Sequence, residues 1–306
     1  MTTALARDLL LVCLNSHEIK NCLGTISRWV AETLREPMSN RSKYLRGQNL
    51  VSFAPGRVPT SRPCGPEVLP PVLVVLHQET SSPGRVGNAL RALGYRLDIR
   101  RPRFGDVLPA TLDDHAGAVI FGGPMSANDT DDYVRSEIDW IEIPLRERRP
   151  FLGICLGAQM LAKQLGASVA PHPEGVAQIG YYPIRPTAAG MGLCPDWPAQ
   201  VYHWHREGFE LPCGAELLAS GDDFPVQAIR YDTCFGLQFH PDVTYAMMHR
   251  WTTRGCDRMD SPGARPRHQH FEDRAVYDTA ERVWLRHFIE GWLARAPTAA
   301  LAQAAE

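Results

Sequence analysis

The sequence predicts an α/β fold in which an open, mostly parallel sheet carries helices on both faces. Two observations support this prediction. Between residues 72 and 165, short apolar runs alternate with segments of helical length, a pattern typical of strand–helix–strand crossovers. From about residue 168 the pattern changes to short strands and turns. This change indicates that the sheet continues with mixed or antiparallel strands.

Four strands and three helices are predicted in the first half of the fold. Most of the strands are apolar runs without polar alternation, as expected when both faces of a sheet are covered. Glycines close two of the helices, and the third begins with acidic and ends with basic residues, as the helix dipole favours. The predicted strands are 72–76, 95–99, 116–121 and 151–154, and the predicted helices are 84–94, 132–147 and 156–165.

The second half is predicted to contain short strands and one long helix. Apolar alternation and turn residues give the strands 180–184, 200–203, 227–230 and 235–239. A polar break is expected over 251–263. Apolar residues then recur near helical spacing over 275–293, which predicts a helix that packs back on the body of the domain.

Three parts follow one another along the chain. Residues 1–70 contain a possible amphipathic helix at 17–35 and then a polar, basic, Pro-rich stretch. They have too little periodic apolar content to bury much surface, so a weakly ordered extension or linker is predicted. Residues 71–252 are predicted to form the main domain. Residues 253–306 are predicted to be a linker, a C-terminal helix and a frayed tail.

Composition argues against several classes of protein. The net charge of −2 over 306 residues is unlike that of a nucleic-acid or membrane-surface protein. No apolar run approaches the roughly 18–20 residues that span a bilayer, and the apolar residues 9–14 have no signal-peptide cleavage site after them. The eight cysteines form no CxxC pair, so neither a zinc ribbon nor a disulfide framework is predicted. We expect a cytoplasmic protein without cofactor or metal.

The segment Gly153-Ile154-Cys155-Leu156-Gly157 lies where a predicted strand turns into a predicted helix. Small residues on both sides of a central nucleophile are the pattern of a nucleophile elbow, because the two backbones must pass closely. The N-terminus of the following helix favours the reactive thiolate. The amide of Leu156 is placed to donate to an oxyanion beside the sulfur. The pattern alone is weak, since buried structural cysteines are common.

A cysteine nucleophile needs a histidine base, and that histidine needs a carboxylate to orient it. His240 is the strongest of the 11 histidines, because it ends the predicted strand 235–239 and Pro241 stops the ladder behind it. Sites in open α/β sheets gather at the carboxyl ends of strands, so His240 and Cys155 are expected at the same edge. Asp242 is close enough to accept from the second ring nitrogen.

Other histidines have weaker claims. His203 and His205 have a spacing that could suggest a metal, but no third ligand stands at a recognisable distance. His205 fits better in a loop on the substrate side. His77 also follows a predicted strand, where it would either line the site or belong to a polar turn.

Taken together, these segments resemble the class I, triad-type glutamine amidotransferase family. The matching motifs are Gly153–Gln159 at the elbow, Phe121-Gly122-Gly123-Pro124 at the oxyanion loop and Gln238–Asp242 for base and orienter. The resemblance covers about residues 72–252 in the family's order. It implies a flavodoxin-like fold and is strongest to stand-alone members similar to the glutaminase part of GMP synthase.

The resemblance implies a role for each matching residue. Cys155 would attack the side-chain carboxamide of glutamine, His240 would transfer protons, and Asp242 would hold His240. The amides of Gly123 and Leu156 would form the oxyanion hole. The remaining matches, with a role in substrate binding, are Gly122, Gln159 and His205.

The sequence departs from the family in two places, and several functions stay open. Asp242 stands where the family usually has Glu, and Gln178 stands where relatives often have Glu. No phosphate-binding loop follows Asp242, so ammonia would pass to a separate synthetase subunit. The alternatives are a free-standing γ-glutamyl amide hydrolase, a related cysteine-elbow protease or deglycase, and a non-catalytic binding or regulatory relative.

Overall fold

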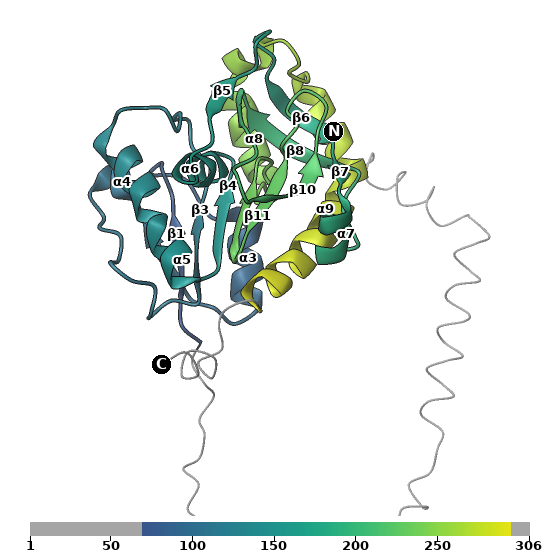
Figure 1. Ribbon diagram of the computed structural model, residues 1–306. Helices are drawn as coiled ribbons and strands as arrows, with labels where there is room; N and C mark the ends of the chain where they lie inside the picture. Colours follow the sequence, from purple (N-terminus) through teal and green to yellow (C-terminus); the bar gives the residue numbers. More distant parts are fainter. Residues whose placement is uncertain (1–68, 295–306) are drawn as a thin grey trace, which may run out of the picture. The chain divides into compact units, whose positions relative to one another are not determined.

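The computed structural model describes residues 69–294. The predicted N-terminal extension, the possible helix at 17–35 and the end of the predicted tail lie outside the described residues. The described residues all belong to one compact unit. Labels of helices and strands follow Figure 1.

An eight-stranded sheet forms the centre of this unit, in the order β2-β1-β3-β4-β12-β11-β10-β7. The first five strands in this order are parallel, and the last three pair antiparallel. The fold class predicted from the sequence is confirmed. The strands are β1 (Val72–Val75), β2 (Leu97–Arg100), β3 (Gly117–Ile120), β4 (Phe151–Ile154), β7 (Arg185–Pro186), β10 (Glu216–Ser220), β11 (Ala228–Tyr231) and β12 (Cys234–Leu237).

Two small antiparallel sheets extend the unit beyond the main sheet. One joins β5 (Val169–Pro171) to β9 (Glu207–Phe209). The other joins β6 (Gln178–Pro183) to β8 (Gln200–His205). Both pairs come from the region in which the sequence predicted short strands and turns.

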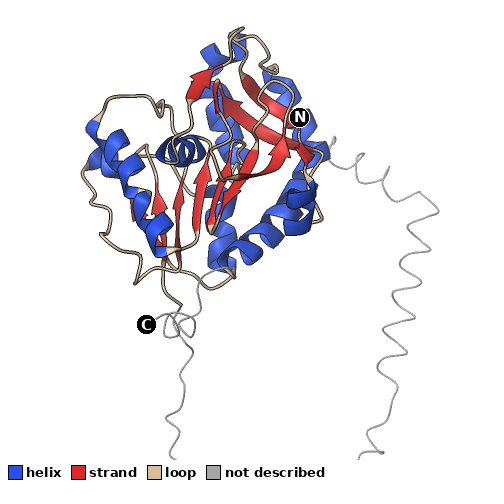
Figure 2. Ribbon diagram, viewed as in Figure 1, coloured by secondary structure: helices blue, strands red, loops and turns tan. Residues whose placement is uncertain are grey.

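Helices cover both faces of the main sheet, and each face has its own apolar cluster (Figure 2). The covering helices are α4 (Asp132–Trp140), α5 (Glu142–Glu147) and α6 (Leu156–Gln164) on one face, and α3 (Gly84–Ala92), α7 (Ala188–Leu193) and α9 (Arg267–Leu293) on the other. Side chains of β1 alternate between the two clusters, because successive residues of a strand point to opposite faces.

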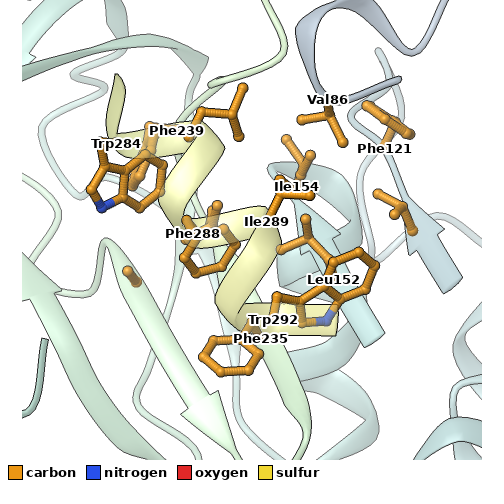
Figure 3. Packing of buried hydrophobic residues seen from close by; sticks show 14 of the residues in the cluster. Val86, Phe121, Leu152, Ile154, Phe235, Phe239, Trp284, Phe288, Ile289 and Trp292 are labelled. Atoms are coloured by element: carbon orange, nitrogen blue, oxygen red, sulfur yellow. The ribbon is translucent and has the colours of Figure 1, made fainter. Parts of the chain in front are cut away.

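The long helix α9 supplies much of the core on its face of the sheet. Trp284 and Trp292 are 0% and 1% exposed. Figure 3 shows both side chains with Phe288 and Ile289 against residues of β4 and β12. The predicted helix therefore packs on the body of the domain as expected. It begins at Arg267 rather than at residue 275, directly after Pro266.

Two predicted segments differ from the structure. The helix predicted over 132–147 is divided at Ile141 into α4 and α5. Pro144 lies in the first turn of α5, where its missing N–H costs no internal hydrogen bond.

The polar break predicted over 251–263 was placed too early. Helix α8 runs over Tyr245–Arg254, and a short 3-10 helix follows over Cys256–Asp260. The Thr244 side chain caps α8 by accepting from the Met247 amide at 3.2 Å. Met247, Met248 and Thr252 are the buried residues of α8, whereas Thr253 and Arg254, which suggested a break, are exposed.

Candidate active site

Four neighbouring parallel strands deliver the candidate site residues to one edge of the sheet. The strands β1, β3, β4 and β12 lie side by side. His77, Gly122, Cys155 and His240 follow their carboxyl ends. The convergence expected from parallel topology is therefore present.

Cys155 lies in the turn between β4 and α6. Its backbone has φ 51° and ψ −103°, a conformation that costs energy for a residue with a side chain. The glycines on either side make the turn possible. A Cβ on Gly153 would lie 2.3 Å from the Gly157 carbonyl oxygen, and a Cβ on Gly157 would lie 2.1 Å from the Ile120 carbonyl oxygen. This is the geometry of a nucleophile elbow.

The thiol, imidazole and carboxylate predicted from the sequence lie together. His240 Nδ1–H donates to Asp242 Oδ1 at 3.1 Å, and the Cys155 sulfur lies near enough to the ring to help raise its pKa. The three residues are 6%, 5% and 3% exposed in the order Cys155, His240, Asp242. The aspartate side chain, one methylene shorter than glutamate, thus reaches His240 in this chain.

The backbone fixes two of these side chains. The Cys155 amide donates to the Leu237 carbonyl at 2.7 Å, and the His240 amide donates to the Tyr202 carbonyl at 2.7 Å. Trp251 adds a wall, since its ring meets the His240 ring edge-on at a centroid distance of 4.9 Å.

The electrostatics of the site favour a charged imidazole. Burial by itself would lower the pKa of His240, but the Cys155 sulfur and the Asp242 carboxylate outweigh it and raise the pKa to about 10. An imidazolium next to sulfur stabilises a thiolate. The arrangement can therefore hold a thiolate–imidazolium pair that is ready for nucleophilic attack.

The Gly122–Gly123 loop packs closely against Cys155, His240 and their neighbours. A Cβ on Gly122 would lie 2.6 Å from His240 Cε1 and 3.4 Å from Cys155 Cβ. A Cβ on Gly123 would lie 3.1 Å from His77 and from Leu156. Glycine is required here because the loop approaches the reactive groups so closely.

His77 supports this loop from below, a role that the sequence left open. Its Nδ1–H donates to the Gly122 carbonyl at 3.2 Å, and its Nε2–H donates to Glu137 Oε2 at 2.7 Å. Both His77 and Glu137 are fully buried. His77 is therefore not a solvated turn residue. It forms a buried pair with Glu137 beneath the loop.

A cavity of about 110 Å³ opens on one side of Cys155. Gln159 and His205 both line it, together with Leu156 and Gly123. The Gln159 side-chain amide donates to the Glu207 carbonyl at 2.9 Å, and His205 Nδ1–H donates to the same carbonyl at 3.0 Å. Burial and the nearby charge of His240 lower the pKa of His205 to about 3, so this histidine is neutral.

His203 and His205, whose spacing could suggest a metal, contact each other. His203 Nδ1 lies 3.0 Å from His205 Nε2, so the two rings are hydrogen-bonded to each other. Burial also lowers the pKa of His203. Over residues 69–294, no group of three or more His, Cys, Asp or Glu side chains is arranged to hold a metal ion.

Gln178, the second departure from the family pattern, lies next to the cavity without lining it. Its neighbours Ala177 and Ile179 are wall residues. The Gln178 amide donates to Asp223 at 3.3 Å and its oxygen accepts from Gln227 at 3.3 Å. Its polar atoms are thus used within a buried network.

Sequence reasoning missed several residues around the site. Trp204 and Trp251 line the space near His240, and Glu137 anchors His77. Their contacts depend on the packing of α4, α8 and β8 against the sheet edge. No local pattern in the sequence predicts this packing. In the part of the chain that the structure describes, no helix is both long enough and apolar enough to cross a membrane.

Comparison with known proteins gives a consistent result. Residues 80–253 match the family model described as glutamine amidotransferase class-I. A glutamine amidotransferase-like protein of Salmonella typhimurium, YfeJ, is 33% identical over 180 residues, which cover 56% of this chain and 74% of that protein. The glutamine-hydrolyzing GMP synthase of Thermomicrobium roseum is 32% identical over 175 residues, which cover 55% of this chain and 31% of the synthase.

Solved structures show the same architecture. A glutamine amidotransferase from Methylobacillus flagellatus superposes with a TM-score of 0.70 at 25% sequence identity, covering 74% of this chain and 96% of that chain. The chain thus spans most of a single amidotransferase domain but only about a third of the GMP synthase it matches.

Proposed function

The chain belongs to the class I glutamine amidotransferase family, and we propose that it hydrolyses a γ-glutamyl carboxamide through a Cys155 thioester. The observation that carries this proposal is the buried Cys155–His240–Asp242 constellation at the carboxyl edge of the sheet. The products would be glutamate and ammonia, or glutamate and an amine. Neither a metal nor a cofactor enters the reaction.

The smaller cavity is proposed to hold the γ-glutamyl part of the substrate. It lies against Cys155 and is bounded by Gln159 and His205. Arg206 and Glu207 line the same cavity and offer opposite charges to the α-carboxylate and the α-ammonium group. This placement puts the γ-carbonyl carbon next to the sulfur.

In the first half of the reaction, the Cys155 thiolate would attack the γ-carbonyl carbon and form a carbon–sulfur bond. Negative charge would develop on the carbonyl oxygen, next to the amides of Gly123 and Leu156. Leu156 is the first residue of α6, so its N–H has no partner within the helix. The His240 imidazolium would then give its proton to the departing nitrogen as the carbon–nitrogen bond breaks.

In the second half, neutral His240 would take a proton from water, and the resulting hydroxide would attack the thioester. The carbon–sulfur bond breaks, glutamate leaves, and the thiolate–imidazolium pair is restored. Asp242 keeps the Nε2 side of the ring turned towards the sulfur in both halves, because it occupies Nδ1.

The fate of the nitrogen depends on a partner. Some relatives are named glutamine-hydrolyzing GMP synthases, and their name implies transfer of ammonia to a synthetase centre. We propose a separate synthetase subunit as the acceptor when glutamine is the substrate. A free-standing γ-glutamyl amide hydrolase is the alternative, and the larger cavity described below favours it.

The proposal can be tested with a glutamine analogue that alkylates the nucleophile, 6-diazo-5-oxo-L-norleucine. Mass spectrometry should find one adduct on Cys155 in the full-length protein, and none in Cys155→Ala. The matched control is Cys213→Ala, which removes an exposed cysteine and should label like the wild type. Ammonia release from glutamine should follow the same order.

Two results would overturn this assignment. Labelling or ammonia release that persists undiminished in Cys155→Ala would exclude the thioester. If the wild type is not labelled either alone or in a lysate that contains partner proteins, a non-catalytic binding or regulatory role would be favoured.

A further inference from the structure

A second, larger cavity of about 300 Å³ opens on the other side of the catalytic pair. His240, Asp242 and Gly122 line it, whereas Cys155 lines only the smaller cavity. The two cavities share four wall residues, which are Gly123, Pro124, Trp204 and Arg258. A single molecule bound across this shared wall would therefore present its middle to the reactive groups.

The larger cavity carries an excess of positive charge. Arg250, Arg254 and Arg258 line it at intervals of four residues along α8 and the 3-10 helix that follows. Among the ion pairs of residues 69–294, none uses any of these three guanidinium groups. Two acidic residues also line the cavity, Asp257 and Asp242, and the latter is bound to His240.

Neutral hydrogen-bonding groups form another part of the cavity wall. They come from the loop between β1 and α3 and comprise Gln78, Thr80, Ser81 and Ser82. Arginine binds carboxylate and phosphate oxygens with paired N–H donors, and hydroxyl groups can satisfy the remaining oxygen lone pairs. The chemistry of this wall fits an oxyanion.

The size of the cavity exceeds the needs of ammonia. A water molecule, which is of similar size, takes up about 30 Å³ in the liquid, roughly a tenth of the volume available. The proton for the departing nitrogen comes from His240 in the proposed mechanism, so the nitrogen leaves on the side of the larger cavity. Any substituent on this nitrogen would extend towards the arginines.

We infer that the larger cavity binds the amine part of a substituted γ-glutamyl amide, and that this amine carries a carboxylate or phosphate group. The inference rests on the proposed function and names its substrate class. The carbon–nitrogen bond of the amide breaks, the amine takes the His240 proton and leaves with its oxyanion, and water releases glutamate from Cys155. Atoms and protons balance without an oxidant or a nucleotide.

Binding can be measured separately from turnover by using Cys155→Ala in full-length protein. Calorimetry would compare γ-glutamyl-β-alanine with its neutral counterpart γ-glutamyl-β-alaninamide, and γ-glutamyl-phosphoethanolamine would represent the phosphate class. At least one of the two anionic ligands should bind 10-fold or more tightly than the neutral ligand. Adding Arg254→Gln should remove most of this preference, and adding Arg282→Gln, an exposed arginine of α9 that lines neither cavity, should leave it unchanged.

Equal dissociation constants for the anionic and neutral ligands, or a preference that survives Arg254→Gln, would overturn the inference. Turnover of the same amides by wild-type protein then separates the two proposals. Preferential binding of the anionic ligands without any hydrolysis would contradict the proposed function but support the binding site. Hydrolysis of glutamine without preferential binding of the anionic ligands would support the proposed function but contradict the binding site.

Discussion

Gly122→Ala is the sharpest test of the site geometry. The added Cβ would lie 2.6 Å from His240 Cε1 and 3.4 Å from Cys155 Cβ. Ordinary contacts begin at 3.4 Å, so the His240 ring must move by roughly 0.8 Å away from the added Cβ, which disturbs its position beside Cys155. A misplacement of about 1 Å costs on the order of 100-fold in rate. We therefore expect the rate of Cys155 labelling by 6-diazo-5-oxo-L-norleucine to fall about 100-fold.

The loss should come from geometry rather than from unfolding. The backbone of Gly122 does not need a positive φ, so the free energy of unfolding should fall by no more than about 1–3 kcal/mol, the usual cost of overpacking. Gly192→Ala is the matched control, because a Cβ there has no neighbour within 4 Å, and its labelling rate should stay within about twofold of the wild type. A Gly122→Ala protein that keeps more than a third of the wild-type rate would refute this reasoning.

Three further predictions concern buried charges. Asp242→Asn removes a carboxylate that helps to raise the pKa of His240 to about 10. Activity should therefore fall roughly 100-fold, and the alkaline limb of the pH–rate profile should move to lower pH. An alkaline limb at the wild-type pH would contradict this. Burial raises the pKa of Glu281 from 4.5 to about 8, so the folded state holds a proton that the unfolded chain releases, and the carboxyl group destabilises the fold increasingly as pH rises from 4.5 to 8. Glu281→Gln should change the unfolding free energy little at pH 5 and raise it at pH 8.5 by roughly 5 kcal/mol at most, measured in urea; equal effects at both pH values would exclude this cause. His77→Phe leaves Glu137 buried without its partner and should cost about 3 kcal/mol, whereas the double variant with Glu137→Leu should regain most of this stability but not the labelling rate.

The sheet and the grouping of Cys155, His240 and Asp242 could be predicted from the sequence because both depend on local patterns. Buried parallel strands are continuous apolar runs, and the observed β1 and β4 match the predicted segments 72–76 and 151–154 closely. The elbow needs small residues at fixed spacing around Cys155, and a strand must end near His240. Such signals lie within a few residues of the groups that they identify.

Features that depend on contacts between distant segments could not be predicted in the same way. His77 and Glu137 are 60 residues apart, and each would suit a solvated position. The polar residues from 251 onwards suggested a break, although Arg254 still belongs to α8 and lines a cavity together with Arg250. Polarity alone does not distinguish a solvated helix face from the wall of a binding site.

The reach of Asp242 depends on α3 as well as on the length of its side chain. The Asp242 carbonyl accepts from the Arg85 amide at 2.9 Å, at the start of α3. Gly84 allows this approach, since a Cβ there would lie 2.0 Å from the same oxygen and its φ is 50°. The N-terminus of α3 therefore fixes the backbone that carries the carboxylate, and the carboxylate meets His240 Nδ1 at 3.1 Å. An aspartate at this position is consistent with a working triad because a glycine 158 residues earlier determines where its backbone lies.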